Sequence, residues 1–115
     1  MSGKFVFANE VERETLDWGT LGWMSRPATT GARDLVVIEV NLLPGRGHNF
    51  HKHPDQEEVI YVLAGEVEQW LEQERRILRP GDAVFIDADV VHASFNVSAA
   101  PARLLAILGP CVGEG

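Results

Sequence analysis

The chain is a succession of short apolar or alternating runs separated by glycine, proline and acidic residues. Strands of all-β proteins have this length and these boundaries, whereas helices need longer segments with a period near 3.6 residues. We expect strands at residues 4–8, 22–26, 35–43, 59–63, 67–71, 75–78, 83–86, 93–97 and 103–108. Only residues 10–17, with acidic residues at their start, suggest a helical turn. The pattern predicts an all-β sandwich or barrel.

Two of these runs, residues 35–38 and 104–108, are apolar on both alternating faces. A strand that is covered on both faces has this composition. In a small barrel one face fills the interior, so the other face needs an extra layer or a partner chain. We therefore expect a homodimer. Trp18, Trp23 and Trp70 are candidates for the covered outer surface, although packing in the core is the commoner role for each of them.

The run that follows residue 66 is rich in charge and predicts a hairpin with a solvated face. Its turn is expected near Gln73, although the segment has neither the glycine nor the asparagine that two-residue turns usually contain. A second carboxylate site is not expected there.

The length of 115 residues is that of one domain. Seventeen acidic against ten basic residues give a net charge of −7, which argues against nucleic acid or an anionic membrane as partner. No apolar run approaches the roughly 20 residues of a membrane span, and only four apolar residues separate Lys4 from Asn9, too few for a signal-peptide core. We expect a cytoplasmic protein. Cys111 is the only cysteine, so a metal site would use histidine and carboxylate.

Three of the four histidines lie within residues 48–53. His51 and His53 are two residues apart, so on an extended strand their imidazoles leave from the same face. The acidic pair Glu57 and Glu58 follows directly. Two imidazoles and a carboxylate converging from one side of a sheet indicate a metal site with open coordination positions.

These residues stand at the spacings of two motifs of the cupin superfamily, which the chain resembles from about residue 35 to residue 108. In the first motif a glycine, His-x-His, a glutamate and a second glycine follow at set intervals, matched by Gly45, His51, His53, Glu58 and Gly65. In the second motif the matches are Gly81, His92 and Asn96. Asp87 and Asp89 depart from that motif, which has proline and glycine there, so the shape of the turn before His92 stays open.

The resemblance implies a double-stranded β-helix, or jelly-roll barrel, as a single domain. Residues 35–108 would form the barrel core, residues 1–34 an N-terminal extension able to contact a dimer partner, and residues 109–115 a C-terminal tail. It also implies one divalent transition metal (Fe, Mn, Ni, Zn or Cu) in the barrel mouth. The implied ligands are His51, His53, Glu58 and His92. The six residues before Gly65 favour Glu58 over Glu57.

Other polar residues near these motifs have less certain roles. His48 could contact a substrate or a ligand, but an ordinary loop histidine is the commoner case. If His92 points inward, Ser94 and Asn96 do too, and we expect them to line the site or to bond to its ligands. Three arginines could each hold a substrate carboxylate or simply lie at the surface: Arg26, Arg33 and Arg46.

A barrel of this kind hosts many reactions, so the fold does not name one. The resemblance implies a metalloenzyme, dioxygenase-like on a small organic substrate, with Glu58 as ligand and catalytic proton acceptor. The first alternative is a non-redox isomerase or lyase of sugars or uronates, for which Asp87, Asp89 or His48 would be the base. The second is a non-catalytic module that binds or senses a small molecule.

Overall fold

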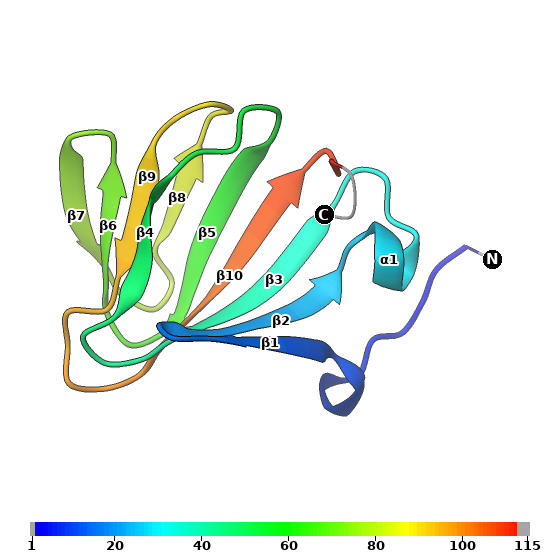
Figure 1. Cartoon of the computed structure of the whole chain (residues 1–115), viewed down its shortest axis with the longest axis horizontal. Coiled ribbons are helices and arrows are strands. Elements are labelled where there is room, and N and C mark those ends of the chain that lie inside the picture. Colours follow the sequence, from blue (N-terminus) through cyan, green and yellow to red (C-terminus); the bar gives the residue numbers. More distant parts are fainter. Residues whose placement is uncertain (1, 113–115) are drawn as a thin grey trace.

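The computed structural model describes residues 2–112, which form two antiparallel β-sheets (Figure 1). In chain order the elements are the 3₁₀ turn η1 (Ala8–Glu10), β1 (Glu12–Leu16), β2 (Gly19–Ser25), the helix α1 (Pro27–Thr30), β3 (Val36–Leu42), β4 (Gly47–His51), β5 (Glu57–Ala64), β6 (Val67–Leu71), β7 (Glu74–Leu78), β8 (Ala83–Ile86), β9 (His92–Phe95) and β10 (Ala102–Gly109). The six-stranded sheet has the order β1-β2-β3-β10-β5-β8, and the four-stranded sheet has the order β4-β9-β6-β7. The all-β jelly-roll prediction is confirmed.

Aliphatic side chains alternate inward along the central strands of the six-stranded sheet. In β10 the buried positions are Ala102, Leu104, Ala106 and Leu108, and the residues between them are more exposed. Strands β3 and β5 repeat the alternation with their own valine, leucine and isoleucine side chains. Burying each large aliphatic side chain stabilises the fold by roughly 1.5–3 kcal/mol. This alternation, with a period of two residues, therefore determines which face of each strand points into the barrel interior.

The expected helical turn at residues 10–17 was wrong. Strand β1 occupies most of this segment and pairs along its whole length with β2, from Glu12 opposite Trp23 to Leu16 opposite Gly19. The pairing with β2 provides hydrogen bonds to the backbone of this segment, whereas a short isolated helix would form such bonds less stably. Residues 4–8, expected as a strand, have no strand partner within the part of the chain that the structure describes.

The sequence pattern also missed β4, because the run Gly-His-Asn-Phe-His lacks alternating apolar residues. The hairpin between β6 and β7 lies where it was expected: Leu71 is opposite Glu74, and Glu72 and Gln73 form the turn.

Strands β1 and β2 belong to the same sheet as the barrel core, since β2 pairs with β3. Near the C-terminus, the Cys111 amide donates to the carbonyl of Arg33 at 3.0 Å. Of the expected tail at 109–115, residues 113–115 lie outside the described part. Within residues 2–112 no helix has the length and apolar character required to cross a membrane.

Candidate metal centre

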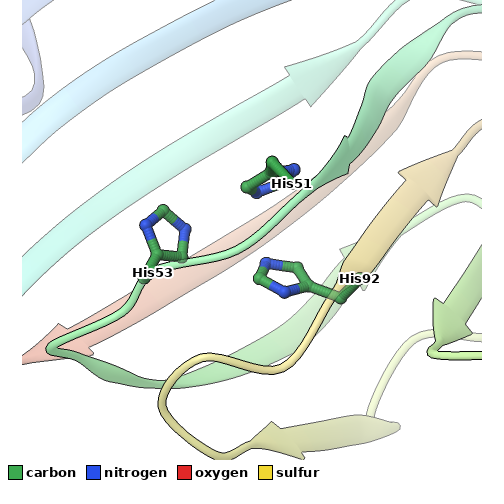
Figure 2. A group of neighbouring side chains, drawn as sticks. All are labelled: His51, His53 and His92. Atoms are coloured by element: carbon green, nitrogen blue, oxygen red, sulfur yellow. The ribbon is translucent and has the colours of Figure 1, made fainter.

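Three histidines converge between the two sheets (Figure 2). His51 ends β4 and stands opposite His92, the first residue of β9. His53 lies two residues beyond the end of β4, so the loop, and not strand alternation, brings it to the other two. One ring nitrogen from each histidine lies within 4.8 Å of the others. The three rings could therefore hold one metal ion.

Glu58 lies beside these histidines, on the inner face of β5. Its side chain is 6% exposed, and its Oε1 lies 3.1 Å from His92 Nε2 and 3.5 Å from His53 Nε2. The neighbouring Glu57 is exposed, because successive strand residues point to opposite faces. Of the acidic pair, only Glu58 lies within reach of the histidines.

In two of the imidazole rings, a hydrogen bond to a backbone carbonyl determines which of the two ring nitrogens carries the hydrogen. His51 Nδ1 lies 2.6 Å from the carbonyl of Asn49, and His92 Nδ1 lies 2.9 Å from that of Val90. A carbonyl can only accept, so both Nδ1 atoms carry hydrogen, and in the neutral rings each Nε2 keeps its lone pair. Histidine ligands of metals are oriented in this way.

Two buried polar atoms of the centre lack a hydrogen-bond partner among residues 2–112: Glu58 Oε1 and His92 Nε2. They face each other at 3.1 Å without the geometry of a hydrogen bond. Leaving such groups unpaired costs about 1–3 kcal/mol each, so native structures rarely do so without a functional reason. A cation between them would satisfy both atoms.

The electrostatics of the centre also fit a cation. Burial lowers the pKa of His51 and of His53, and neighbouring imidazoles lower both further, so these rings are neutral near pH 7 as metal binding requires. Burial alone would lower the pKa of His92, but the Glu58 carboxylate and the Val90 carbonyl outweigh it and raise the pKa above its usual value. A positive charge next to Glu58 is therefore favoured.

The histidines line a cavity of about 180 Å³ inside the barrel. Apart from Glu58, Ser94 and the four histidines, its lining is apolar: Trp18, Leu21, Trp23, Ile38, Val40, Leu42, Ile60, Leu104, Ala106 and Leu108. No lysine or arginine lines it, and Arg26, Arg33 and Arg46 all lie elsewhere. The sequence indicated no such chamber, because its walls come from residues with ordinary core patterns on β2, β3, β5 and β10.

For His48 the sequence left open a contact with substrate or ligand beside the commoner role of a loop histidine, and in the structure His48 lines this cavity. Its ring stacks on His51, with centroids 3.8 Å apart and planes 18° apart, and on Trp18, with centroids 5.0 Å and planes 10° apart. Burial and the adjacent His51 lower the pKa of His48 to about 4. A neutral ring thus separates His51 from the indole of Trp18. The strand β4, which the sequence pattern missed, places it there.

The turn before His92, which holds the two departures from the second motif, is fixed by bonds of Asp89 to the loop of His53. Asp89, at the position of the expected glycine, has φ +67°, a left-handed conformation that aspartate tolerates better than most residues. Its amide donates to the carbonyl of His53 at 2.9 Å, and its carboxylate pairs with Lys52 at 3.1 Å. The turn therefore anchors the loop that carries His53. Neither Asp87 nor Asp89 lines the cavity.

Ser94 and Asn96 are both buried, but their side chains make different contacts. Ser94 lines the cavity and donates to Gln69 Oε1 at 2.6 Å. Asn96 Nδ2 donates to the carbonyls of Leu42, at the end of β3, and of Ala100, so this side chain ties β3 to the loop before β10 and does not itself line the cavity.

The chain matches the family described as "Cupin domain" over residues 38–108. It is a cupin. The Polyketide synthase CurC of Streptomyces cyaneus is 31% identical over 110 residues, which are 96% of this cupin and 71% of CurC. The Pectin degradation protein KdgF of Dickeya dadantii is 34% identical over 83 residues, 71% of this cupin and 74% of KdgF. The solved structure of the polyketide cyclase RemF from Streptomyces resistomycificus shares the fold, with a TM-score of 0.80, 24% identity and coverage of 95% and 80%.

Proposed function

We propose that this cupin is a metalloenzyme that binds one divalent metal through His51, His53, Glu58 and His92. In this proposal it acts on an enolisable dicarbonyl compound of the polyketide type. The apolar cavity beside the four side chains supports the choice of substrate. A uronate brings a carboxylate and several hydroxyls, which need charged or polar partners, and the lining offers no basic side chain for them.

The side chains have separate tasks in this mechanism. Trp18 and Trp23 offer apolar walls for a planar conjugated substrate and exclude water. A bound divalent cation would act as a Lewis acid on a substrate carbonyl and acidify the adjacent C–H bond. Glu58, the one carboxylate of the cavity lining, takes the α-proton from carbon. The resulting carbon nucleophile would attack a second carbonyl of the same substrate, and the oxygen of that carbonyl takes up a proton.

Dioxygenation of the same enolate is the second candidate. Three imidazoles and a carboxylate suit redox-active as well as redox-inert metals, and four protein ligands leave coordination positions open. Both candidates share removal of the α-proton by Glu58 and differ in what happens next. Loss of water with no oxygen uptake indicates cyclisation, and incorporation of both oxygen atoms indicates dioxygenation.

The ligand set can be tested separately from the reaction. Protein purified without added metal should retain close to one divalent ion per chain, measured by inductively coupled plasma mass spectrometry. His51→Ala and His92→Ala should lose it, while circular dichroism shows an intact barrel. An unchanged metal content in either folded variant would refute the ligand assignment.

The substrate class is tested with an aryl diketone, a poly-β-ketone chain and an unsaturated uronate. We expect enolate absorbance when the aryl diketone meets the metal-loaded protein, a cyclised product from the poly-β-ketone, and neither with Glu58→Gln. An oxygen electrode and product masses separate the two fates. Turnover of the uronate without binding of either ketone would overturn the proposal.

A further inference from the structure

A row of three polar side chains crosses the four-stranded sheet beside the histidines of the candidate metal centre. In the strand register His48 of β4 is opposite Ser94 of β9, and Ser94 is opposite Gln69 of β6. In the neighbouring row His51 is opposite His92. Residues two apart on a strand have side chains on the same face, so Ser94 points into the barrel on the same side as His92.

Ser94 and Gln69 form a buried polar pair of which one member faces the cavity. Among residues 2–112, Ser94 is the one side chain with a hydroxyl on the cavity lining, and it is buried. Gln69 is buried too, but it does not line this cavity. The Gln69 amide can therefore act on a molecule in the cavity only through the Ser94 hydroxyl.

The hydrogen bonds of this pair run in one direction. Gln69 Nε2 donates to the carbonyl of Trp70 at 3.1 Å, and Ser94 Oγ lies 2.6 Å from Gln69 Oε1. Because a carbonyl only accepts, the Trp70 carbonyl selects the amide nitrogen of Gln69 and leaves the amide oxygen facing Ser94. An amide oxygen also only accepts, so the Ser94 hydroxyl donates its single hydrogen to Gln69.

The Ser94 oxygen therefore presents only lone pairs to the cavity. A free hydroxyl rotates and can bind either a donor or an acceptor, but the hydrogen of this hydroxyl is already used. A hydroxyl group of a bound molecule can donate to the Ser94 oxygen. A ketone or ether oxygen at the same place would face a lone pair without a hydrogen between them, which is unfavourable in a buried site.

The distance along β9 relates this acceptor to the metal centre. His92 and Ser94 are two residues apart on the strand, which corresponds to about 6.6 Å at a rise of about 3.3 Å per residue. This spacing is comparable to the span of one aromatic ring that carries oxygen atoms at opposite positions. A substrate with a carbonyl group beside His92 can thus reach Ser94 with a hydroxyl on the far side of one ring.

We propose that Ser94 selects substrates that carry an enol or phenol hydroxyl, by accepting a hydrogen bond from that group, and that Gln69 is the positioning residue that makes Ser94 an acceptor. The substrate is then a dicarbonyl compound with such a hydroxyl about one ring away from the dicarbonyl group. The inference rests on the proposed function, because it names a second group of the same substrate. It holds for cyclisation and for dioxygenation alike.

A pair of ligands tests this selection in the wild-type protein. An aryl diketone with a para-hydroxyl group can donate to Ser94, whereas its para-methoxy analogue has the same dicarbonyl group and cannot donate. In titration calorimetry with the Zn²⁺-loaded protein, the hydroxy ligand should bind about five- to tenfold more tightly, as expected for one hydrogen bond. Equal binding of the two ligands would overturn the inference and leave the proposed function standing. If neither ligand binds, both fail.

Substitutions then assign the selection to the pair. Ser94→Ala removes the acceptor, so the ratio of the two dissociation constants should fall close to one. Gln69→Met has a similar size but cannot accept the Ser94 hydrogen. The freed hydroxyl can then donate to the methoxy oxygen, and affinity for the methoxy ligand should rise about three- to tenfold. The double variant should lose this gain, because no hydroxyl remains.

A purely structural role of the pair gives a different result. Gln69→Met would then weaken both ligands by the same factor and leave the ratio of their dissociation constants as in wild type. That outcome, or an unchanged ratio in Ser94→Ala, would overturn the inference. Circular dichroism and the metal content of each variant check that the barrel and the centre are intact, and the ligand pair on wild type decides the case if a variant does not fold.

Discussion

At the scale of single residues, hydrogen bonds to backbone carbonyls orient two histidine rings of the candidate metal centre. The carbonyls of Asn49 and Val90 accept hydrogen bonds from Nδ1–H of His51 and of His92, so in the neutral rings Nε2 keeps its lone pair. Asp89, which departs from the family motif, uses its amide to bond to the carbonyl of His53. These partners are backbone groups, so no side-chain pattern in the sequence could reveal them. The four side chains proposed as ligands were, by contrast, implied by the resemblance to the two cupin motifs.

His48 provides a prediction at this scale. Its ring lies between Trp18 and His51 in nearly parallel planes, so we expect it to hold His51 in position through stacking. His48→Ala should weaken metal affinity about three- to tenfold, the value of one aromatic stacking pair. His48→Phe keeps the stack and should restore most of the affinity. Titration calorimetry with Zn²⁺ measures both.

The alternative for His48 is a direct bond from its ring nitrogen to the metal or to a metal-bound water. In that case His48→Phe would lose as much affinity as His48→Ala. Quenching of the Trp18 indole on addition of Cu²⁺ gives a second signal that does not depend on turnover.

At the scale of elements, pairing between strands determined the conformation of two segments whose own sequences favour a different one. Strand β1 forms in a segment rich in glutamate because β2 lies beside it. The two-residue turn between β6 and β7 forms without glycine or asparagine, and Glu72 accordingly has φ +55°. An L-residue other than glycine or asparagine in this region carries about 1–2 kcal/mol of strain.

The turn therefore offers a stabilising substitution. Glu72→Asn keeps the backbone bond from residue 72 to the carbonyl of Val91 and relieves part of the strain. We expect the free energy of unfolding to rise by about 0.5–1 kcal/mol. Gln73→Asn is the matched control, because φ of Gln73 is not positive, and it should change stability little. Urea denaturation of the two variants compares them directly.

At the scale of the whole molecule, the candidate centre connects the two sheets. His51 and His92 belong to the four-stranded sheet, and Glu58 belongs to the six-stranded sheet. An ion held by all of them would cross-link the barrel, and its binding energy would add to the stability of the fold.

Metal removal should therefore destabilise the protein. Free metal at a hundredfold excess over its dissociation constant adds about 2.7 kcal/mol, which for a chain of this length raises the melting temperature on the order of 10 °C. Scanning calorimetry with and without a chelator measures the difference. The same scan of His92→Ala should show no dependence on the chelator, and a shift as large as that of wild type would place the ion elsewhere.

Several features could be predicted from sequence because they depend on local order along the chain. Short apolar runs at residues 59–63 and 103–108 predict strands, and glycine and proline mark their ends. The spacings from Gly45 to Gly65 and from Gly81 to Asn96 carried the resemblance to the cupin family, and that resemblance implied His51, His53, Glu58 and His92 as one ligand set. The six residues before Gly65 favoured Glu58 over Glu57, and in the structure Glu58 is buried while Glu57 is exposed.

Other features depend on which segments contact each other in the folded chain, and the order of residues within one segment does not show this. The cavity walls come from strands far apart in sequence, so Trp18 and Trp23 looked like ordinary core residues. His48 became part of the site only because β4 pairs with β9 and Trp18 lies across from it. Pairing with the adjacent strand β2 also outweighed the helix preference at residues 10–17. Residues at fixed intervals along the chain thus carried the resemblance that implied the proposed ligands, and the three-dimensional packing of distant strands determined the chamber beside them.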